Sequence, residues 1–256
     1  MGVVALIADQ APQTLGVSAV ARSLNLPKAV AHRILKELVS AGLLSFDDDS
    51  KQYRLGPGAL TVGLAALRSL DVPTVARPYL ENLVRETGET ATLSMRQGWT
   101  RVYIAQVISP HEVHMQVSLG TRHPLHAGSS SKAILAAMAP DEVAAYLERQ
   151  QLEELTSSTI TSAARLLDDL RRVRRRGYAV SLGERQRGAG SVAAAIHGSD
   201  GNAWGSVSLC GPRDRFEAGV CEAHGELLVA AAERISEQIG YRKTPAEEEP
   251  MVSSAL

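Results

Sequence analysis

The chain has few aromatic residues, few cysteines and almost no net charge, and each shortage excludes a class of protein. Phe, Trp and Tyr make up 4% of the 256 residues, too few for a stacking surface that binds single-stranded nucleic acid. The two cysteines, Cys210 and Cys221, form neither a CxxC pair nor a disulfide framework, which favours a reducing compartment. The formal net charge is −1, so any contact with DNA must use locally placed cations.

Long apolar runs and a secretory leader are also missing. No stretch approaches the ~20 apolar residues that are needed to span a bilayer. The first residues lack the basic, apolar and small-residue segments of a signal peptide. We therefore expect a cytoplasmic protein with no membrane partner. Hydrophobic residues make up 45% of the chain and charged residues 21%, which is enough to bury the cores of two ordinary domains.

The N-terminal segment shows the pattern of a winged helix-turn-helix domain. Apolar residues at helical spacing predict three short helices, near residues 2–9, 18–24 and 27–41. Ser18 is placed to cap the second helix, and Pro27 suits the first turn of the third. An acidic turn at 47–49 then separates two strand-like segments and predicts a β-hairpin. Three helices and a hairpin would form one DNA-binding module with a recognition helix and a wing.

Polar side chains gather on one side of the third predicted helix. Lys28, His32 and Lys36 recur every fourth residue, so they share a face of that helix. Arg33 or Lys36 could read guanine edges, whereas Lys28 would contact phosphate. Two further cations in the predicted wing could reach the DNA backbone. The alternative is an ordinary solvated helix face. The candidate DNA-binding residues are Lys28, His32, Arg33, Lys36, Lys51 and Arg54.

The charge balance of this module is only mildly positive. Residues 1–65 contain six lysines and arginines against five acidic residues. A single module is therefore expected to bind DNA weakly, so that dimerisation is needed for useful affinity. We expect a homodimer or tetramer on a double-stranded DNA operator.

Beyond a Gly-Pro-Gly boundary at 56–58, the pattern becomes that of an α+β domain. Strands are expected near 90–96, 101–107, 113–118, 178–182, 192–197 and 204–210. Helices are expected near 71–87, 130–138, 140–150, 162–176 and 218–239. Such a mixture predicts an antiparallel sheet flanked by helices. The expected domains are 1–57 for the winged helix, 58–71 for a linker helix, 72–242 for the α+β domain and 243–256 for a flexible tail.

Several segments of the chain resemble one known family in order and at its spacing. In the N-terminal part they are Val17–Ala21, Leu26–Lys28, Ala31–Leu35, Leu38, Gly42 and Tyr53–Gly56. In the C-terminal part they are Gly120–Ala127, Lys132–Ala133, Gly177–Ala179, Val192–Ala194 and Ser208–Pro212. These segments resemble the IclR-type transcriptional regulators. The resemblance implies a winged helix, a linker helix and a GAF-like effector domain, in a dimer or tetramer that controls operons. One departure is Ala29-Val30, where the family usually has hydroxyl residues that contact phosphate.

The resemblance also implies an effector pocket. The ligand-contacting positions of the family fall on Met115, Ser129, Ser130, Ser181, Ser191, Ser208 and Cys210. Ser129 and Ser130 would begin a helix whose N–H groups and dipole suit a carboxylate. The family often has an acidic residue where Ser181 stands and a cysteine where Ser191 stands, so this pocket should be less negative. A small carboxylate or a hydroxylated metabolite is the expected effector. Without the resemblance, close packing of a strand and a helix would be the favoured explanation of these small residues.

Two readings from other functional classes remain. Ser129 and Lys132 form an SxxK motif, the nucleophile motif of penicillin-binding enzymes, but no SDN or KTG motif accompanies it. A serine hydrolase is therefore a remote alternative, and we expect no enzymatic activity. The second alternative is a ligand-sensing module whose winged helix does not bind DNA.

Neither a metal nor a cofactor is expected. His111, His114, His123 and His126 lie close together in the sequence, but nothing forces them to converge on one ion. The GxGxxA segment at 188–193 lacks the apolar strand that precedes a dinucleotide-binding loop. We interpret the arginine-rich segment 165–176 as the solvated face of a helix.

Overall fold

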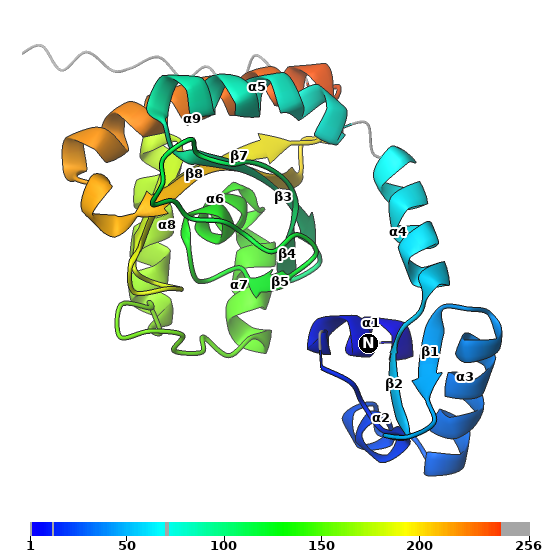
Figure 1. Ribbon diagram of the computed structural model, residues 1–256. Coiled ribbons are helices and arrows are strands. Elements are labelled where there is room, and N and C mark those ends of the chain that lie inside the picture. The colour runs from blue at the N-terminus through cyan, green and yellow to red at the C-terminus, as the bar shows by residue number, and fades with distance from the viewer. Residues whose placement is uncertain (1, 12, 70–71, 242–256) are drawn as a thin grey trace, which may run out of the picture. The chain divides into compact units, whose positions relative to one another are not determined.

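The N-terminal part of the chain folds as the winged helix that the sequence predicts. The computed structural model describes residues 2–11, 13–69 and 72–241, and the chain divides into two units between Asp71 and Val72. The predicted tail, 243–256, lies outside the described residues. The first unit comprises α1 (Val3–Gln10), α2 (Val17–Ser23), α3 (Lys28–Ser40), β1 (Leu44–Asp47), β2 (Gln52–Leu55) and α4 (Pro57–Ser69), as Figure 1 shows.

The turn between α2 and α3 depends on one left-handed residue. Asn25 has a φ of 51°, which asparagine tolerates better than most residues, and it ends α2. The N–H of Leu26 then bonds to the carbonyl oxygen of Ala21 at 2.9 Å. Ser18 does not cap α2, because the helix begins at Val17 with Gly16 as its N-cap residue and no side-chain cap bond. The expected position of this cap was therefore wrong by two residues.

A small apolar core holds the three helices against the hairpin. β1 and β2 pair antiparallel, and Leu15 adds a two-way backbone bridge to Tyr53 on the other edge of β2. The buried apolar residues of this core are Val3, Leu6, Ile7, Val20, Ala21, Ala31, Leu35, Leu44 and Tyr53. Because α3 contributes only Ala31 and Leu35 to the fully buried set, its other side remains in solvent.

The second unit is an antiparallel sheet covered by helices on both faces. The strand order is β5-β4-β3-β8-β7-β6, and every neighbouring pair is antiparallel. Its elements are α5 (Val72–Thr87), β3 (Thr90–Gln97), β4 (Thr100–Val107), β5 (Arg122–Pro124), α6 (Ser129–Ala137), α7 (Pro140–Arg149), α8 (Ala163–Arg176), β6 (Tyr178–Leu182), β7 (Ala189–His197), β8 (Ala203–Pro212), a 3-10 turn (Arg213–Arg215) and α9 (Ala218–Gln238).

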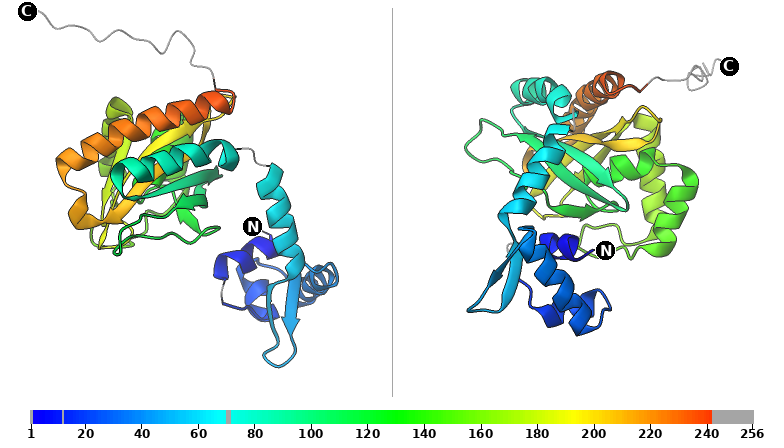
Figure 2. Two further views of the ribbon diagram at one scale, coloured as in Figure 1. Left: turned by 45° about the horizontal axis from the view of Figure 1, so that its top comes forward. Right: turned by 90° about the vertical axis from the view of Figure 1, so that its right-hand side faces the viewer.

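The two faces of the sheet have different side chains. α5 and α9 lie side by side on one face, and α6, α7 and α8 lie on the other (Figures 1 and 2). Strand residues beneath α5 and α9 are apolar, among them Leu93, Val207 and Leu209. Their neighbours Thr92 and Ser208 point to the opposite face, because side chains alternate along a strand. The sheet therefore presents hydroxyl groups to the side covered by α6.

One expected strand is absent, and one short strand was not predicted. Residues 113–118 form no ladder, because side chains satisfy their backbone instead. The amide of Gln106 bonds both the N–H and the carbonyl oxygen of Val117, each at 3.0 Å. The hydroxyl of Thr90 donates to the carbonyl oxygen of Met115 at 2.7 Å. The edge of the sheet next to β4 is taken by β5.

Among the described residues, no helix has the length and apolar character to cross a bilayer.

Gly205 lies on β8 at a point where β3 approaches it closely. A Cβ atom built on Gly205 would lie 2.1 Å from the carbonyl oxygen of Ser94, a backbone atom that cannot move aside. We expect Gly205→Ala to lower the free energy of unfolding by about 1–3 kcal/mol. Gly219→Ala is the matched control, since a Cβ there has open space in α9 and should change stability by less than about 1 kcal/mol. Equal stabilities of the two variants in urea denaturation would contradict so close an approach of the two strands.

Candidate functional site

The exposed side of α3 carries the predicted DNA-contacting residues. Lys28, His32, Arg33 and Lys36 are all exposed, while Ala31 and Leu35 on the opposite side are fully buried. None of these four polar side chains is engaged in an ion pair among the described residues. The helix therefore offers cations and hydrogen-bond donors to a partner, as a recognition helix requires.

The wing is less basic than its sequence suggested. Arg54 is exposed on β2, but Lys51, in the turn, lies 3.6 Å from the carboxylate of Asp48. The carboxylate of Asp47 accepts the N–H of Ser50 and of Asp49, and these bonds lower its pKa. Asp47 thus closes the acidic turn through its carboxylate. The acidic turn offsets part of the positive charge that Lys51 would bring to DNA.

The polar face of the sheet forms the floor of a cavity. The register places Ser181 opposite Ser191, Ser191 opposite Cys210, and Cys210 opposite Thr90, so that one row crosses four strands. In the next row, the hydroxyls of Thr92 and Ser208 lie 2.6 Å apart. Small side chains along these rows leave room between the sheet and α6.

This cavity has a volume of about 50 Å³, and all seven predicted effector-contacting residues line it. Ser129 and Ser130 come from the start of α6, Met115 from the loop after β4, and the other four from β6, β7 and β8. The hydroxyl of Ser129 donates to that of Ser191 at 2.8 Å, which links the helix to the sheet. A cavity of this size holds a few waters or one compact ligand.

A buried ion cluster fixes the start of α6. The ammonium of Lys132 donates to Asp169 at 2.7 Å, to Glu184 at 2.5 Å and to the carbonyl oxygen of Val180 at 2.9 Å. The second carboxylate oxygen of Glu184 accepts the N–H of Gly128 at 2.9 Å, just before the helix. Burial acts to raise the pKa of Asp169, but the charges and hydrogen bonds of Lys132 and Arg172 together outweigh it and lower that pKa. The cluster joins α6, α8 and the end of β6.

Two arginines in the cavity were not predicted. Arg101 on β4 is 1% exposed and donates to the hydroxyls of Ser131, Ser94 and Tyr103 at 2.8–3.0 Å. Arg185, in the loop after β6, also lines the cavity. A sequence signal existed for the first, since Arg101 and Tyr103 alternate inward on one strand. No local pattern distinguished Arg185 from Arg187.

The charges of these arginines act on their neighbours. Burial, followed by the charges of Arg185 and Arg101, lowers the pKa of His123 to about 3. Burial raises the pKa of the Cys210 thiol to about 12, so that no thiolate forms in the cavity at neutral pH. The two arginines therefore bring positive charge to a cavity that the carboxylate of Glu184 also lines.

The geometry disfavours hydrolase chemistry at the SxxK motif. An ammonium group has three hydrogens, and those of Lys132 are directed to three acceptors that do not include Ser129. The Ser129 hydroxyl bonds Ser191 instead. A lysine held as an ammonium group between two carboxylates cannot act as the base that activates a serine.

The histidines of the predicted cluster have separate partners. His126 bonds Tyr146 and the carbonyl oxygen of Glu153, whereas His123 packs edge-on against Tyr103. His114 bonds the carbonyl oxygen of His111. Within the described part of the chain, no group of three or more His, Cys, Asp or Glu residues is arranged to hold a metal ion.

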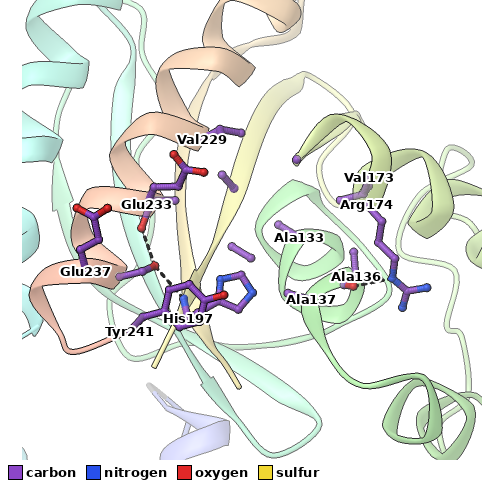
Figure 3. Close-up of a pocket in the computed structure, with 15 residues that line it drawn as sticks. Ala133, Ala136, Ala137, Val173, Arg174, His197, Val229, Glu233, Glu237 and Tyr241 are labelled. Carbon is purple, nitrogen blue, oxygen red and sulfur yellow. Dashed lines mark hydrogen bonds between the residues drawn. The ribbon is translucent and has the colours of Figure 1, made fainter. Parts of the chain in front are cut away.

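A second, larger cavity of about 470 Å³ lies between α6, α8, β7 and α9 (Figure 3). Alanine is the commonest residue of its walls, and two of its polar side chains bond backbone groups. The Arg174 guanidinium donates to the carbonyl oxygen of Ala136, and Ser236 joins the His197 N–H to the carbonyl oxygen of Ala232. Ligand sites need polar groups that converge on the ligand. We therefore take the smaller polar cavity as the candidate effector site, despite its size.

Comparisons with known proteins match both units. The model of the IclR helix-turn-helix domain matches residues 2–48, and that of the C-terminal domain of the bacterial transcriptional regulator IclR matches residues 64–237. The transcriptional repressor AllR of Escherichia coli K12 is 32% identical over 90% of this chain and 84% of its own length.

Solved structures share the fold over nearly the whole chain. An IclR family transcriptional regulator from Brucella abortus has a TM-score of 0.81 and 28% identity, covering 92% of this chain and 89% of that one. An IclR homolog from Microbacterium hydrocarbonoxydans, complexed with 4-hydroxybenzoate, has a TM-score of 0.72 and 23% identity. The match to this homolog covers 93% of this chain and 96% of that one.

Removing the central cation of the buried cluster should lower the stability of the second unit. Lys132→Met leaves Asp169 and Glu184 facing each other without a counter-ion, and we expect a loss of about 3–5 kcal/mol in the free energy of unfolding. Arg171→Met is the matched control, because it breaks only an exposed pair with Asp168 and should cost less than about 1 kcal/mol. Trp99 and Trp204 are the only tryptophans and both lie in the second unit, so their fluorescence follows its unfolding. Similar losses in the two variants would mean that Lys132 is not the centre of this structure.

Proposed function

Because the chain belongs to the IclR family of bacterial transcriptional regulators, we propose specific roles for α3, the wing and the polar cavity. The protein is an effector-responsive, DNA-binding transcription regulator. We propose that α3 and the wing contact an operator, and that the cavity beneath α6 binds the effector. The observation that carries the proposal is the pair of surfaces: an unpaired cationic helix face in one unit, and a polar, positively charged cavity in the other. We assign no enzymatic step to it.

We propose that α3 enters the major groove with its exposed face. Arg33 and Lys36 are placed for base edges, where arginine or lysine pairs with guanine. Lys28, at the first turn, is placed for phosphate, as are Lys51 and Arg54 in the wing. His32 lies one turn from Lys28 on the same face. The exposure of all four α3 residues supports this assignment.

We propose that the protein binds a palindromic operator as a dimer or tetramer. One module carries few net positive charges, and one of its cations, Lys51, is paired with Asp48. Two modules on half-sites about one helical turn, roughly 34 Å, apart would combine their contacts. Effector binding would change the spacing of the two winged helices through α4, by as much as the effector favours one arrangement over the other.

We propose that the effector is a small organic acid. The residues Met115, Ser129, Ser130, Ser181, Ser191, Ser208 and Cys210 would contact it. Hydroxyls of the two sheet rows would orient it, and the first N–H groups of α6, which lack intrahelical partners, would meet its carboxylate. The convergence of all seven residues on one cavity supports these contacts.

The role of Arg33 is tested on selected DNA. Fragments of the source genome that the purified protein retains would supply the cognate site. Arg33→Ala should weaken binding to that site by about 1–3 kcal/mol and relax the base preference at one position of each half-site. The measurement is fluorescence anisotropy with the cognate duplex and single-base variants, at several salt concentrations.

Arg165→Ala is the matched control, because it removes one exposed arginine from α8 in the other unit. It should leave affinity and base preference unchanged. An unaltered base preference in Arg33→Ala would remove Arg33 from base readout. If the wild-type protein retained no sequence and showed no salt-dependent affinity, the alternative of a sensing module without DNA binding would take its place.

A further inference from the structure

Two guanidinium groups share one aromatic ring in the polar cavity. The central carbon of Arg101 lies 4.2 Å from the centroid of the Tyr103 ring, and that of Arg185 lies 5.4 Å from the same centroid. Like charges are thus held close together in a largely buried place. Burial is the main cause that lowers the pKa of Arg101, and the charge of Arg185 adds to it. An arginine nevertheless stays protonated at neutral pH, so both charges persist.

Neither guanidinium is paired with a carboxylate among the described residues. The three hydrogen-bond acceptors around Arg101 are all neutral hydroxyls. The Nη1 atom of Arg185 is buried and has no hydrogen-bond partner within the part of the chain that the structure describes. A buried charge without a counter-ion is expensive, and native structures rarely leave one in this state unless a ligand completes it.

The nearby acidic groups are all committed elsewhere. Glu184 uses one oxygen for Lys132 and the other for the Gly128 N–H. Glu89 forms a two-bond ion pair with Arg215, at 2.5 and 2.8 Å. The Cys210 thiol is neutral, because burial raises its pKa to about 12. The described part of the chain therefore supplies no anion for Arg101 and Arg185.

The remaining groups of the cavity suit an anion as well. Ser129 and Ser130 are both 2% exposed, and their hydroxyls stand beside the N-terminal N–H groups of α6. The side chain of Arg185 reaches this helix start, since its Cδ lies 3.9 Å from a Cβ built on Gly128. An acceptor bound between Arg185 and α6 would meet donors from both sides.

We infer that this cavity recognises a compact dianion, a short dicarboxylate or a phosphate, through Arg101 and Arg185. The inference rests on the proposed function in that it takes the cavity as the effector site, and it adds the charge class of the effector. Two cations without counter-ions are neutralised by two negative charges. A neutral hydroxylated metabolite would leave both unpaired, and a monocarboxylate would leave one. The small volume of the cavity excludes bulky anions.

The inference is tested by the thermal stability of the full-length protein. The probes are oxalate, malonate and inorganic phosphate as dianions, acetate as a monoanion and malonamide as a neutral analogue of malonate, at constant ionic strength. At least one dianion should raise the melting temperature clearly more than acetate, and malonamide should leave it unchanged. Preference for phosphate over the dicarboxylates, or the reverse, then distinguishes the two kinds of ligand.

Arg185→Gln should weaken the binding of the stabilising dianion at least tenfold. Without any ligand, the same variant should melt about 2–4 °C higher than the wild type, because an uncompensated buried charge is gone. Arg187→Gln, two residues along the same loop and exposed, is the matched control and should change neither value.

The inference is overturned if no dianion stabilises the wild type, if malonamide stabilises as well as malonate, or if Arg185→Gln keeps the full response. DNA binding measured on the same samples separates this result from the proposed function. Salt-dependent DNA binding without any response to a dianion would contradict the inference and leave the proposed DNA contacts standing. A dianion response without DNA binding sinks the proposed DNA contacts and leaves the inference standing.

Discussion

The effector unit depends on the burial of one lysine between two carboxylates. Lys132 lies in the first turns of α6, and its partners Asp169 and Glu184 come from α8 and from the loop after β6. These segments are distant in the sequence, and the ion cluster fixes how they meet. Glu184 also holds the N–H of Gly128, so the start of α6 is fixed over the sheet. The cavity exists because this helix start is held in place while the strand residues beneath it are small.

The elements of the fold follow from local patterns, whereas their partners do not. Ser162 and Gly177 mark the two ends of α8, which runs as predicted from the spacing of Leu166, Leu170 and Val173. The strand expected at 113–118 was wrong, because Gln106 and Thr90 bond its backbone through their side chains. Such long-range side-chain bonds leave no periodic trace in the sequence. The strand order of the sheet has the same origin in non-local contacts and could not be predicted from any one segment.

The candidate site residues also divide into those that a local pattern predicts and those that only non-local contacts reveal. The exposed cations of α3 were predictable, because polar residues at every fourth position and a Pro at the helix start are local signals. The seven pocket residues came from the family resemblance, and the structure brings all of them to one cavity. Arg101 and Arg185 were not predicted, because what distinguishes them is the lack of a counter-ion, which can be seen only in the folded structure. Whether a charge is paired depends on every element packed around it, as the contrast between Lys132 and Arg101 shows.

Cations without a counter-ion are a feature that α3 and the polar cavity share. A net charge of −1 tells nothing of where cations stand alone. On α8, Arg171 and Arg172 bond the aspartates three residues before them and stabilise their own helix. On α3 and in the polar cavity the cations face solvent or the cavity interior instead. A buried cation without a counter-ion lowers the stability of the fold, and binding an anion restores it. The exposed cations of α3 carry little of this cost, because water solvates them.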